Sequence, residues 1–553
     1  MSTVAVSATT GWARSPKHTL ANLGVYSVFT WKRNWLRLVI WAVVTVGMIG
    51  FVADYYLGIF GHDKTAMQGF SDIAAQPPMN WLIGTVSDAA ALTLGGAIWS
   101  KYWMFGGLML MIGMLYLTTR NLRGDEDAGR AELMRAYPLG LHSRLAATIW
   151  INVVGSAIIG LLCGPVVAPI IAGSDWGGGA TGAYAFGLSI AGLAILGVGI
   201  GALTNQLAPT NGGANGIGIG VIAVFYVIRL MGDMNNSSTL VWISPIGWGQ
   251  KVDPWGANRL WPILLQVALA AVCIVIAWVL ERRRDLGAGL FAARTGSAHA
   301  TKFTTTSVGL SLRTQRASII AWFVGVVIMG DLLGSVVQKM HDLLSNSTFG
   351  GADVQSGLVE GVIALMSGIV ALCITAFGIQ SISTVRANEE MGLAEAQLAG
   401  PLSRMGWALR RLAVAFALTV LMLLVAGYMM GYAYQAAANA DQTLTMAVFI
   451  KAVLVYLPAI ILLMSVFVLG FGWWPRQSVM VAWIVFGLMF VFMIVGVATK
   501  IPQKVLNLMP FQALPAIPLD PMRWTPVLVE LGIAIVLMVV GLIGFRRRNV
   551  PVL

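Results

Sequence analysis

Two short segments of this sequence carry the same charged residues at the same spacing. Arg123–Leu139 reads RGDEDAGRAELMRAYPL and Arg386–Leu402 reads RANEEMGLAEAQLAGPL, with eight identical positions at a constant offset of 263. The identical positions include Arg123, Glu126, Gly129, Glu132 and Pro138 in the first copy and Arg386, Glu389, Gly392, Glu395 and Pro401 in the second. Asp127 corresponds to Glu390, which keeps the negative charge. Grouped carboxylates complement a basic surface on another protein, so the repetition predicts two docking sites of one kind.

No part of the chain has the residue spacing of a catalytic or cofactor-binding site. The phosphate-binding loop G-x-x-x-x-G-K-[ST] does not occur, and the glycine-rich stretch Gly177–Gly182 contains no lysine. The five histidines and three cysteines are scattered, so their spacing suggests neither a metal site nor a disulfide framework. We therefore expect no catalysis, metal or cofactor in the chain itself.

The elements that position the repeated segments must be membrane-spanning helices. Of the 553 residues, 58% are hydrophobic and 10% are charged, whereas soluble domains contain about 45–50% apolar and about 25% charged residues. A helix of about 20 apolar residues crosses the hydrocarbon core, and only helices satisfy their own backbone hydrogen bonds there. We predict an all-α polytopic membrane protein with about twelve transmembrane helices. The apolar runs are Leu36–Ile59, Trp99–Leu117, Leu145–Ala172, Ala183–Leu203, Ala214–Leu230, Pro262–Leu280, Ile319–Val337, Val362–Ile382, Leu412–Tyr434, Ala452–Phe471, Val479–Val497 and Val527–Phe545.

The distribution of charge orients these spans. With the N-terminus placed in the cytoplasm, the inner segments hold 25 Lys and Arg against nine Asp and Glu, whereas the rest holds ten against fourteen. This asymmetry follows the positive-inside rule, so we expect both termini in the cytoplasm. Arg282–Arg284 and Arg546–Arg548 close the inner ends of the sixth and twelfth spans. The net charge of +12 therefore needs no nucleic-acid partner.

The repeat divides the chain into two parallel six-helix halves, because both halves enter and leave the membrane on the same side. We expect a cytoplasmic N-terminal amphipathic segment at 1–35 and a first transmembrane half at 36–281. A cytoplasmic linker at 282–315 and a second transmembrane half at 316–553 follow. Trp31, Lys32, Arg33 and Trp35 suit a helix that lies at the membrane surface. A simple basic flank of the first span fits the same residues.

Each repeated segment is expected to form a short helix that carries its acids at the N-terminus. Asp125, Glu126 and Asp127 would then face the positive end of the helix dipole, and Pro138 would stop the helix. One interpretation is that these helices only tie neighbouring spans together at the membrane surface. Interfacial helices favour Lys and Arg, however, so repeated carboxylates favour docking of a protein partner.

The string R-x-x-E-[DE]-x-G-x-A-E with a following proline resembles the coupling-helix loop of type-2 ATP-binding-cassette (ABC) exporter permeases. The second copy, which continues as Pro401-Leu-Ser-Arg-Met-Gly-Trp407, is especially similar to the actinobacterial polyketide-antibiotic (tetronasin-type) exporters and multidrug efflux permeases. Those permeases also fuse two six-helix units, so the resemblance covers nearly the full length. It implies a bacterial plasma-membrane permease that exports hydrophobic antibiotics or drugs by alternating access. Two copies of a separate ABC ATPase, which bind ATP and Mg, would drive the transport.

The resemblance also assigns roles to the repeated residues. In the family, each coupling helix sits in a groove of an ATPase subunit. ATPase contacts are therefore expected for Glu126, Asp127, Gly129, Glu132, Pro138, Glu389, Glu390, Gly392, Glu395 and Pro401. Leu393 departs from the family pattern, because an arginine, here Arg130 in the first copy, usually follows the glycine. Small re-entrant helices are expected within Asp233–Leu260 and Thr499–Thr525.

Flexible methionines and broad aromatic rings suit a cavity for varied lipophilic ligands. The candidates are Trp103, Phe105, Met109, Phe225, Trp483, Phe486, Met489 and Phe490. Contact with lipid or with neighbouring helices explains the same residues equally well.

Two other classes of protein fit a twelve-span chain. A facilitator-type secondary drug transporter, driven by a proton gradient, also has parallel six-helix halves. It predicts a Gly-x-x-x-Asp-Arg-x-Gly-Arg-Arg-like loop between the second and third spans, and Arg120–Arg144 contains no such string. A membrane scaffold or a membrane-embedded lipid enzyme is the other class. The sequence offers no catalytic constellation for the enzyme, and a scaffold gives no reason for two matched loops.

Overall fold

The computed structural model describes residues 19–75, 84–285, 287–291, 299–345, 352–437, 444–498 and 508–549. Every regular element within these residues is a helix, which confirms the expected all-α fold. The helices form two compact units that divide between Thr295 and Gly296. This division falls inside the stretch 282–315 that the sequence predicts as a linker.

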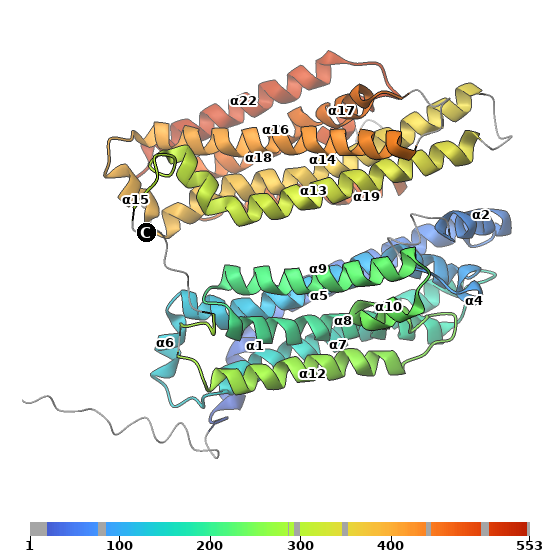
Figure 1. The fold of residues 1–553 in the computed structure, drawn as a ribbon, viewed down its shortest axis with the longest axis horizontal. Helices are drawn as coiled ribbons and strands as arrows, with labels where there is room; N and C mark the ends of the chain where they lie inside the picture. The colour runs from blue at the N-terminus through green and yellow to red at the C-terminus, as the bar shows by residue number, and fades with distance from the viewer. Residues whose placement is uncertain are drawn as a thin grey trace, which may run out of the picture. The chain divides into compact units, whose positions relative to one another are not determined.

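The first unit is built around one buried helix. α8 is covered by three others, α5, α7 and α12, and its sequence is rich in Gly and Ala, which lets the neighbouring helices approach closely. The helices of this unit are α1 (Leu23–Phe60), α2 (Lys64–Ala75), α4 (Asp88–Ala91), α5 (Leu94–Asp127), α6 (Arg130–Arg135), α7 (Ser143–Ile171), α8 (Ala180–Leu207), α9 (Asn211–Met234), α10 (Ser238–Ile243), α11 (Pro245–Gln250) and α12 (Trp261–Glu281). Figure 1 shows that α6 lies at one end of the unit, whereas α2 and α4 lie at the other.

The second unit repeats the helix pairings of the first. α13 packs on α16 as α1 packs on α7, and α18 packs on α22 and α14 as α8 packs on α12 and α5. Its helices are α13 (Ser307–Ser345), α14 (Ala352–Glu390), α15 (Leu393–Leu398), α16 (Arg404–Ala437), α17 (Met446–Leu454), α18 (Leu457–Trp473), α19 (Ser478–Ala498), α21 (Pro510–Ala513) and α22 (Trp524–Arg547). The internal repeat of the sequence is therefore also a repeat of the packing.

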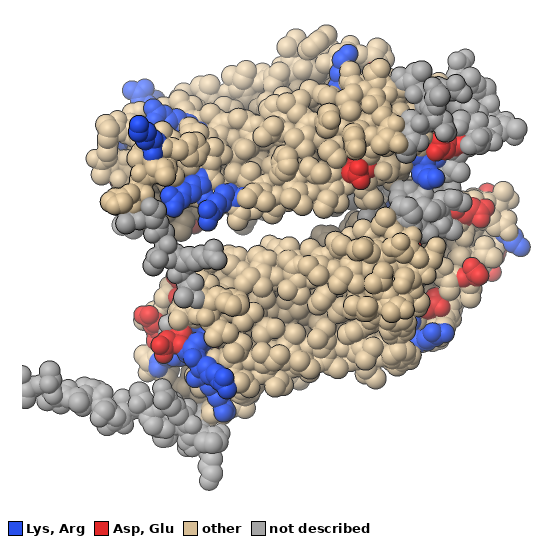
Figure 2. Space-filling model, viewed as in Figure 1, with Lys and Arg blue, Asp and Glu red and all other residues tan. Residues whose placement is uncertain are grey.

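Eleven helical stretches in the described residues are long and apolar enough to cross a membrane, with α17 and α18 counted together as Met446–Trp473. The remaining expected span, Val479–Val497, coincides with the 21-residue helix α19, Ser478–Ala498, in which Ser478–Phe490 counts as a shorter apolar helix. The chain is thus a multi-pass membrane protein. In Figure 2 the charged side chains gather at the two ends of each unit, and the visible lateral surface between them is almost free of charge, as a lipid-facing band requires.

Two expected boundaries differ from the structure. α1 begins at Leu23 and continues without a break to Phe60, so the expected surface segment and the first span form one helix from Leu23 onward. The tenth expected span, Ala452–Phe471, lies within the single candidate span Met446–Trp473, in which α17 ends at Leu454 and α18 begins at Leu457. Pro458 lies in the first turn of α18, where its missing N–H and its ring end the preceding helix. Residues 1–18 lie outside the described part of the chain.

Short helices also occur where the re-entrant segments are expected. α10 and α11 lie within Asp233–Leu260, and α21 lies within Thr499–Thr525. Part of the second segment, residues 499–507, lies outside the described residues.

Candidate functional site

The two repeated segments fold into the same turn at the end of a long helix. In the first unit α5 ends at Asp127, Gly129 adopts a left-handed conformation with φ of 69°, and α6 follows. In the second unit α14 ends at Glu390, Gly392 has φ of 70°, and α15 follows. Ala131 and Ala394 anchor the two short helices, since both are buried. The sequence repeat therefore specifies two copies of one local structure.

The prediction that the acids begin the short helices is wrong. Asp125, Glu126 and Asp127 do not begin the short helix; they form the C-terminal end of α5, and Glu389 and Glu390 end α14 in the same way. The negative end of a helix dipole disfavours carboxylates. Ion pairs with arginines hold four of these acids instead, namely Asp125, Glu126, Glu389 and Glu390.

Glu126 is buried among three arginines. Its side chain is 2% exposed and lies 2.8 Å from Arg123, 2.7 Å from Arg284 and 3.5 Å from Arg144. Arg123 donates from both terminal nitrogens to backbone carbonyls, of Ala288 among others. A carboxylate in this position neutralises cations inside the unit, so the predicted ATPase contact of Glu126 is not a surface contact in this conformation.

Glu389 has the same environment in the second unit. Its side chain is 1% exposed and binds Arg386 at 3.2 Å and both terminal nitrogens of Arg548. Trp407 stands at offset 263 from Arg144, and its indole N–H donates to Gln397 at 2.8 Å. The second cluster therefore has two arginines where the first has three.

The remaining acids of the repeat are more accessible. Asp127 accepts a hydrogen bond from the backbone N–H of Asn211 at 2.7 Å, which supports the N-terminus of α9 with a negative charge. Glu390 lies 3.1 Å from Arg386, with 58% of its side chain exposed. Glu132 and Glu395 occupy the first turns of α6 and α15, and both are exposed. Pro138 and Pro401 are exposed just beyond the two short helices.

Large apolar side chains accompany these exposed acids. Leu133 and Tyr137, at and just after α6, are each 72% exposed, and Met391 and Leu393 flank the start of α15 with 64% and 44% exposure. Apolar side chains bordered by charges are typical of a protein interface. Sequence reasoning named the acids of these surfaces and missed their apolar members, although Leu133 and Tyr137 lie inside the repeated segment.

Gly129 and Gly392 are needed for their backbone conformation. No heavy atom lies within 4 Å of a Cβ built at either position, so a side chain has room, but an L-residue pays roughly 1–2 kcal/mol in the left-handed region. We expect Gly129→Ala and Gly392→Ala each to destabilise the short helix by about this amount. The matched control is Gly124→Ala in α5, where the nearest atom to the new Cβ is 3.7 Å away. Thermal unfolding in detergent would measure the difference, and equal midpoints for the three variants would contradict it.

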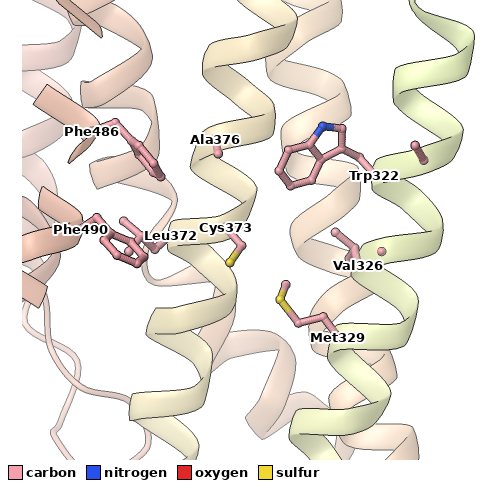
Figure 3. A pocket seen from close by; sticks show the side chains of 10 residues that line it. Trp322, Val326, Met329, Leu372, Cys373, Ala376, Phe486 and Phe490 are labelled. Carbon is pink, nitrogen blue, oxygen red and sulfur yellow. The ribbon is translucent and has the colours of Figure 1, made fainter. Parts of the chain in front are cut away.

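An apolar pocket lies between α13, α14 and α19 of the second unit. Its volume is about 410 Å³, which is within the range of small-molecule sites. Figure 3 shows Phe486 and Phe490 on one side and Trp322 and Met329 on the other, with Cys373 between them on α14. The lining residues are Ala321, Trp322, Gly325, Val326, Met329, Leu372, Cys373, Ala376, Phe486 and Phe490.

The pocket unites two of the eight predicted cavity residues, Phe486 and Phe490. Trp103 is fully buried in the core of the first unit, whereas Phe105 and Met109 are each 48% exposed. The other three are the half-buried Phe225 and Met489 and the exposed Trp483. No sequence signal indicated that α13 and α14 form the opposite wall of the pocket. Among the described residues, no group of three or more His, Cys, Asp or Glu side chains could hold a metal ion.

Ligand pockets often lie between the helices of a bundle. The fold, with its candidate membrane spans and its apolar pocket, places the chain among polytopic membrane proteins.

Comparison with known proteins identifies the family. Residues 305–546 match the family described as multidrug efflux system permease Rv1217c, C-terminal domain. The chain is also 32% identical over 492 residues to the multidrug efflux system permease protein Rv1217c of Mycobacterium tuberculosis, and the match covers 86% of each protein. The chain therefore belongs to the family of multidrug efflux system permeases.

Proposed function

We propose that this chain is the permease subunit of an ABC exporter that removes hydrophobic compounds from a bacterial cell. A separate ATPase, present in two copies, binds ATP and Mg²⁺ and docks on α6 and α15. These short helices and both chain termini then lie on the cytoplasmic side of the plasma membrane. The observation that supports this proposal is the pair of matched short helices, each with an exposed acid and exposed apolar side chains.

The surfaces of α6 and α15 suit a soluble protein better than a lipid headgroup layer. Helices that bind anionic membranes carry Lys and Arg, whereas the first turn of each short helix carries an acid, Glu132 or Glu395. Two such surfaces in one chain match two copies of one partner. The difference between Arg130 and Leu393 makes the two surfaces chemically unequal, so we expect the two copies to bind with different affinity.

The pocket of the second unit is proposed as part of the path of the substrate. Its lining is almost entirely apolar and includes Trp322, Phe486, Phe490 and the flexible Met329. Such side chains adapt to ligands of different shape, which fits the multidrug efflux function of the Mycobacterium tuberculosis relative. Lipophilic antibiotics of the polyketide class are the first substrates to test.

A charge reversal on both short helices tests the docking. Glu132→Lys combined with Glu395→Lys should abolish co-purification of the ATPase and ATP-driven dye uptake into inverted vesicles, because each docking surface then repels the basic surface it met before. The protein should still insert, because both side chains are exposed. Asp285→Lys, at an exposed position outside the short helices, is the matched control. Unchanged uptake in the double variant, or uptake that follows the proton gradient and not ATP, would refute the proposal.

A further inference from the structure

Each unit contains a bidentate ion pair between an acid at the end of its second long helix and an arginine just beyond the end of its last helix. Arg284 donates to Glu126 from Nη2 to Oε1 at 2.7 Å and from Nη1 to Oε2 at 2.8 Å. Arg548 donates to Glu389 from Nη1 to Oε1 and from Nη2 to Oε2, the latter at 2.9 Å. The sequence offsets are 263 for the acids and 264 for the arginines. The pair is therefore a third element of the internal repeat, because in both units the two terminal nitrogens of the guanidinium face the two oxygens of the carboxylate.

The two pairs share the same supporting contact. Arg123 reaches Glu126 Oε2 at 2.8 Å from one turn earlier in α5, and Arg386 reaches Glu389 Oε2 at 3.2 Å from the same position in α14. All four members of the bidentate pairs are buried or nearly so, with at most 12% of a side chain exposed. Planar, bidentate pairing fixes both position and orientation. Each pair thus holds two helix ends in one defined geometry.

The surroundings of the pairs have diverged. In the first unit His142 binds Glu281 at 2.6 Å and accepts a hydrogen bond from Arg282 at 3.0 Å. The matching place in the second unit is aromatic: Phe545 stacks on Trp407 and Phe471. Arg548 itself lies over the rings of Phe471 and Phe545, with distances of 4.7 and 5.1 Å to their centres. Both units therefore contain the acid–arginine pair, but the side chains that pack around it differ.

We propose that these pairs are transmission links. Glu126–Arg284 ties the turn that carries α6 to the end of α12, and Glu389–Arg548 ties the turn that carries α15 to the end of α22. Displacement of a short helix by the ATPase then moves the last span of the same half together with α5 or α14. This inference rests on the proposed function, because it needs a partner that moves α6 and α15. It assigns Glu126 and Glu389 as positioning residues, not as direct contacts of the partner.

Adjacent arginines provide matched controls. Arg283 and Arg547 directly precede Arg284 and Arg548, and both are exposed. In the complex with its ATPase, Arg284→Ala and Arg548→Ala should lower the amount of dye transported per ATP hydrolysed by about tenfold, a typical coupling effect. Co-purification of the ATPase should persist. Arg283→Ala and Arg547→Ala should behave like the unchanged protein. Equal transport per ATP in all four variants would overturn the proposal.

Further variants distinguish the loss of the ion pair from a failure of the protein to fold. Arg284→Lys and Arg548→Lys keep the charge but lose the planar fork, so they should fold and still transport less per ATP than the controls. Glu389→Arg combined with Arg548→Glu restores a pair of opposite charges, and it should transport more per ATP than either single change. A double variant that is no better than the single variants would count against a link through this pair.

A measurement without the ATPase separates this proposal from the proposed function. Amide hydrogen exchange of the purified chain should rise in 384–400 for Arg548→Ala and in 121–137 for Arg284→Ala, and it should not rise for the neighbouring controls. If no ATPase binds the unchanged chain, the proposed function fails. The exchange pattern then tests the links independently: a rise confined to the arginine variants supports them, and no rise contradicts them.

Discussion

Filling the apolar pocket at Gly325 is expected to stop the efflux of bulky lipophilic compounds while the bundle stays as stable as before. Gly325 lines the pocket from α13, and no heavy atom lies within 4 Å of a Cβ built there. A Cβ at this position therefore meets open space, so we expect a leucine side chain there to occupy part of the pocket. It also replaces a residue that weakens helices by about 1 kcal/mol relative to alanine. The variant Gly325→Leu should lose about tenfold or more in dye efflux, since a filled apolar site forfeits several buried methylene groups of the ligand.

The control for this variant is a second helical glycine with equal space. Gly532 lies on α22, is exposed, and also has no heavy atom within 4 Å of a built Cβ. Gly532→Leu should transport normally, and both variants should unfold at or above the temperature of the unchanged protein. ATP hydrolysis by the partner should remain in Gly325→Leu, because the docking helices are untouched. Normal efflux of large and small dyes by Gly325→Leu would show that the pocket is not on the substrate path.

The helices were predictable from sequence because each span must be apolar over its own length. Local composition therefore located the spans, and α7, α8, α9 and α12 have nearly the predicted bounds. The errors arose where composition says little about continuity. Nothing in the polar and aromatic flank near Trp31 and Trp35 showed that α1 continues through it. The division at Pro458 carried a sequence signal, the proline itself, which the apolar run masked.

The repeated turn was predictable, whereas the partners of its acids were not. Glycine and proline positions are local signals, and Gly129 and Gly392 mark the turn in both units. The arginines that pair bidentately with Glu126 and Glu389, Arg284 and Arg548, come from 158 and 159 residues away, so no local pattern reveals these two pairs. One signal was present: Arg282–Arg284 and Arg546–Arg548 close equivalent spans at nearly the same offset as the acids. In the sequence, an arginine that only flanks a membrane span cannot be distinguished from an arginine that pairs with a particular acid.

The pocket shows a similar limit. Phe486 and Phe490 were among the predicted cavity residues because broad aromatic rings suit lipophilic ligands. Trp322 and Met329 belong to a different helix, and only the packing of α13, α14 and α19 brings them opposite the two phenylalanines. Which faces of two helices meet depends on side-chain packing across the whole unit. The pattern of one sequence does not indicate which helix faces will meet.

Breaking the ion pair at the far end of the first unit should cost more stability than any change at the surface. Arg229 and Asp233 lie 2.6 Å apart on α9 with almost no exposure. Gln250 of α11 accepts a hydrogen bond from Arg229 at 3.1 Å and donates to Asp233 at 3.2 Å and to the hydroxyl of Thr85 at 2.7 Å. The cluster thus joins α9 and α11 to the chain before α4. Removing one member of a buried pair leaves an uncompensated charge and costs about 3–5 kcal/mol.

The matched comparison is an exposed pair, Arg523 and Asp520, with side chains 61% and 41% exposed. Arg523→Met should change stability by about 0–1 kcal/mol, the range of surface ion pairs, whereas Arg229→Met should lower the unfolding midpoint in detergent strongly. Replacing both partners, as Arg229→Met with Asp233→Leu, should recover much of the loss, because no buried charge remains unpaired. If the double variant were as unstable as Arg229→Met alone, the cluster would be held by its hydrogen bonds to Gln250 and not by the charge pair. Equal midpoints for Arg229→Met and Arg523→Met would contradict the burial of the pair itself.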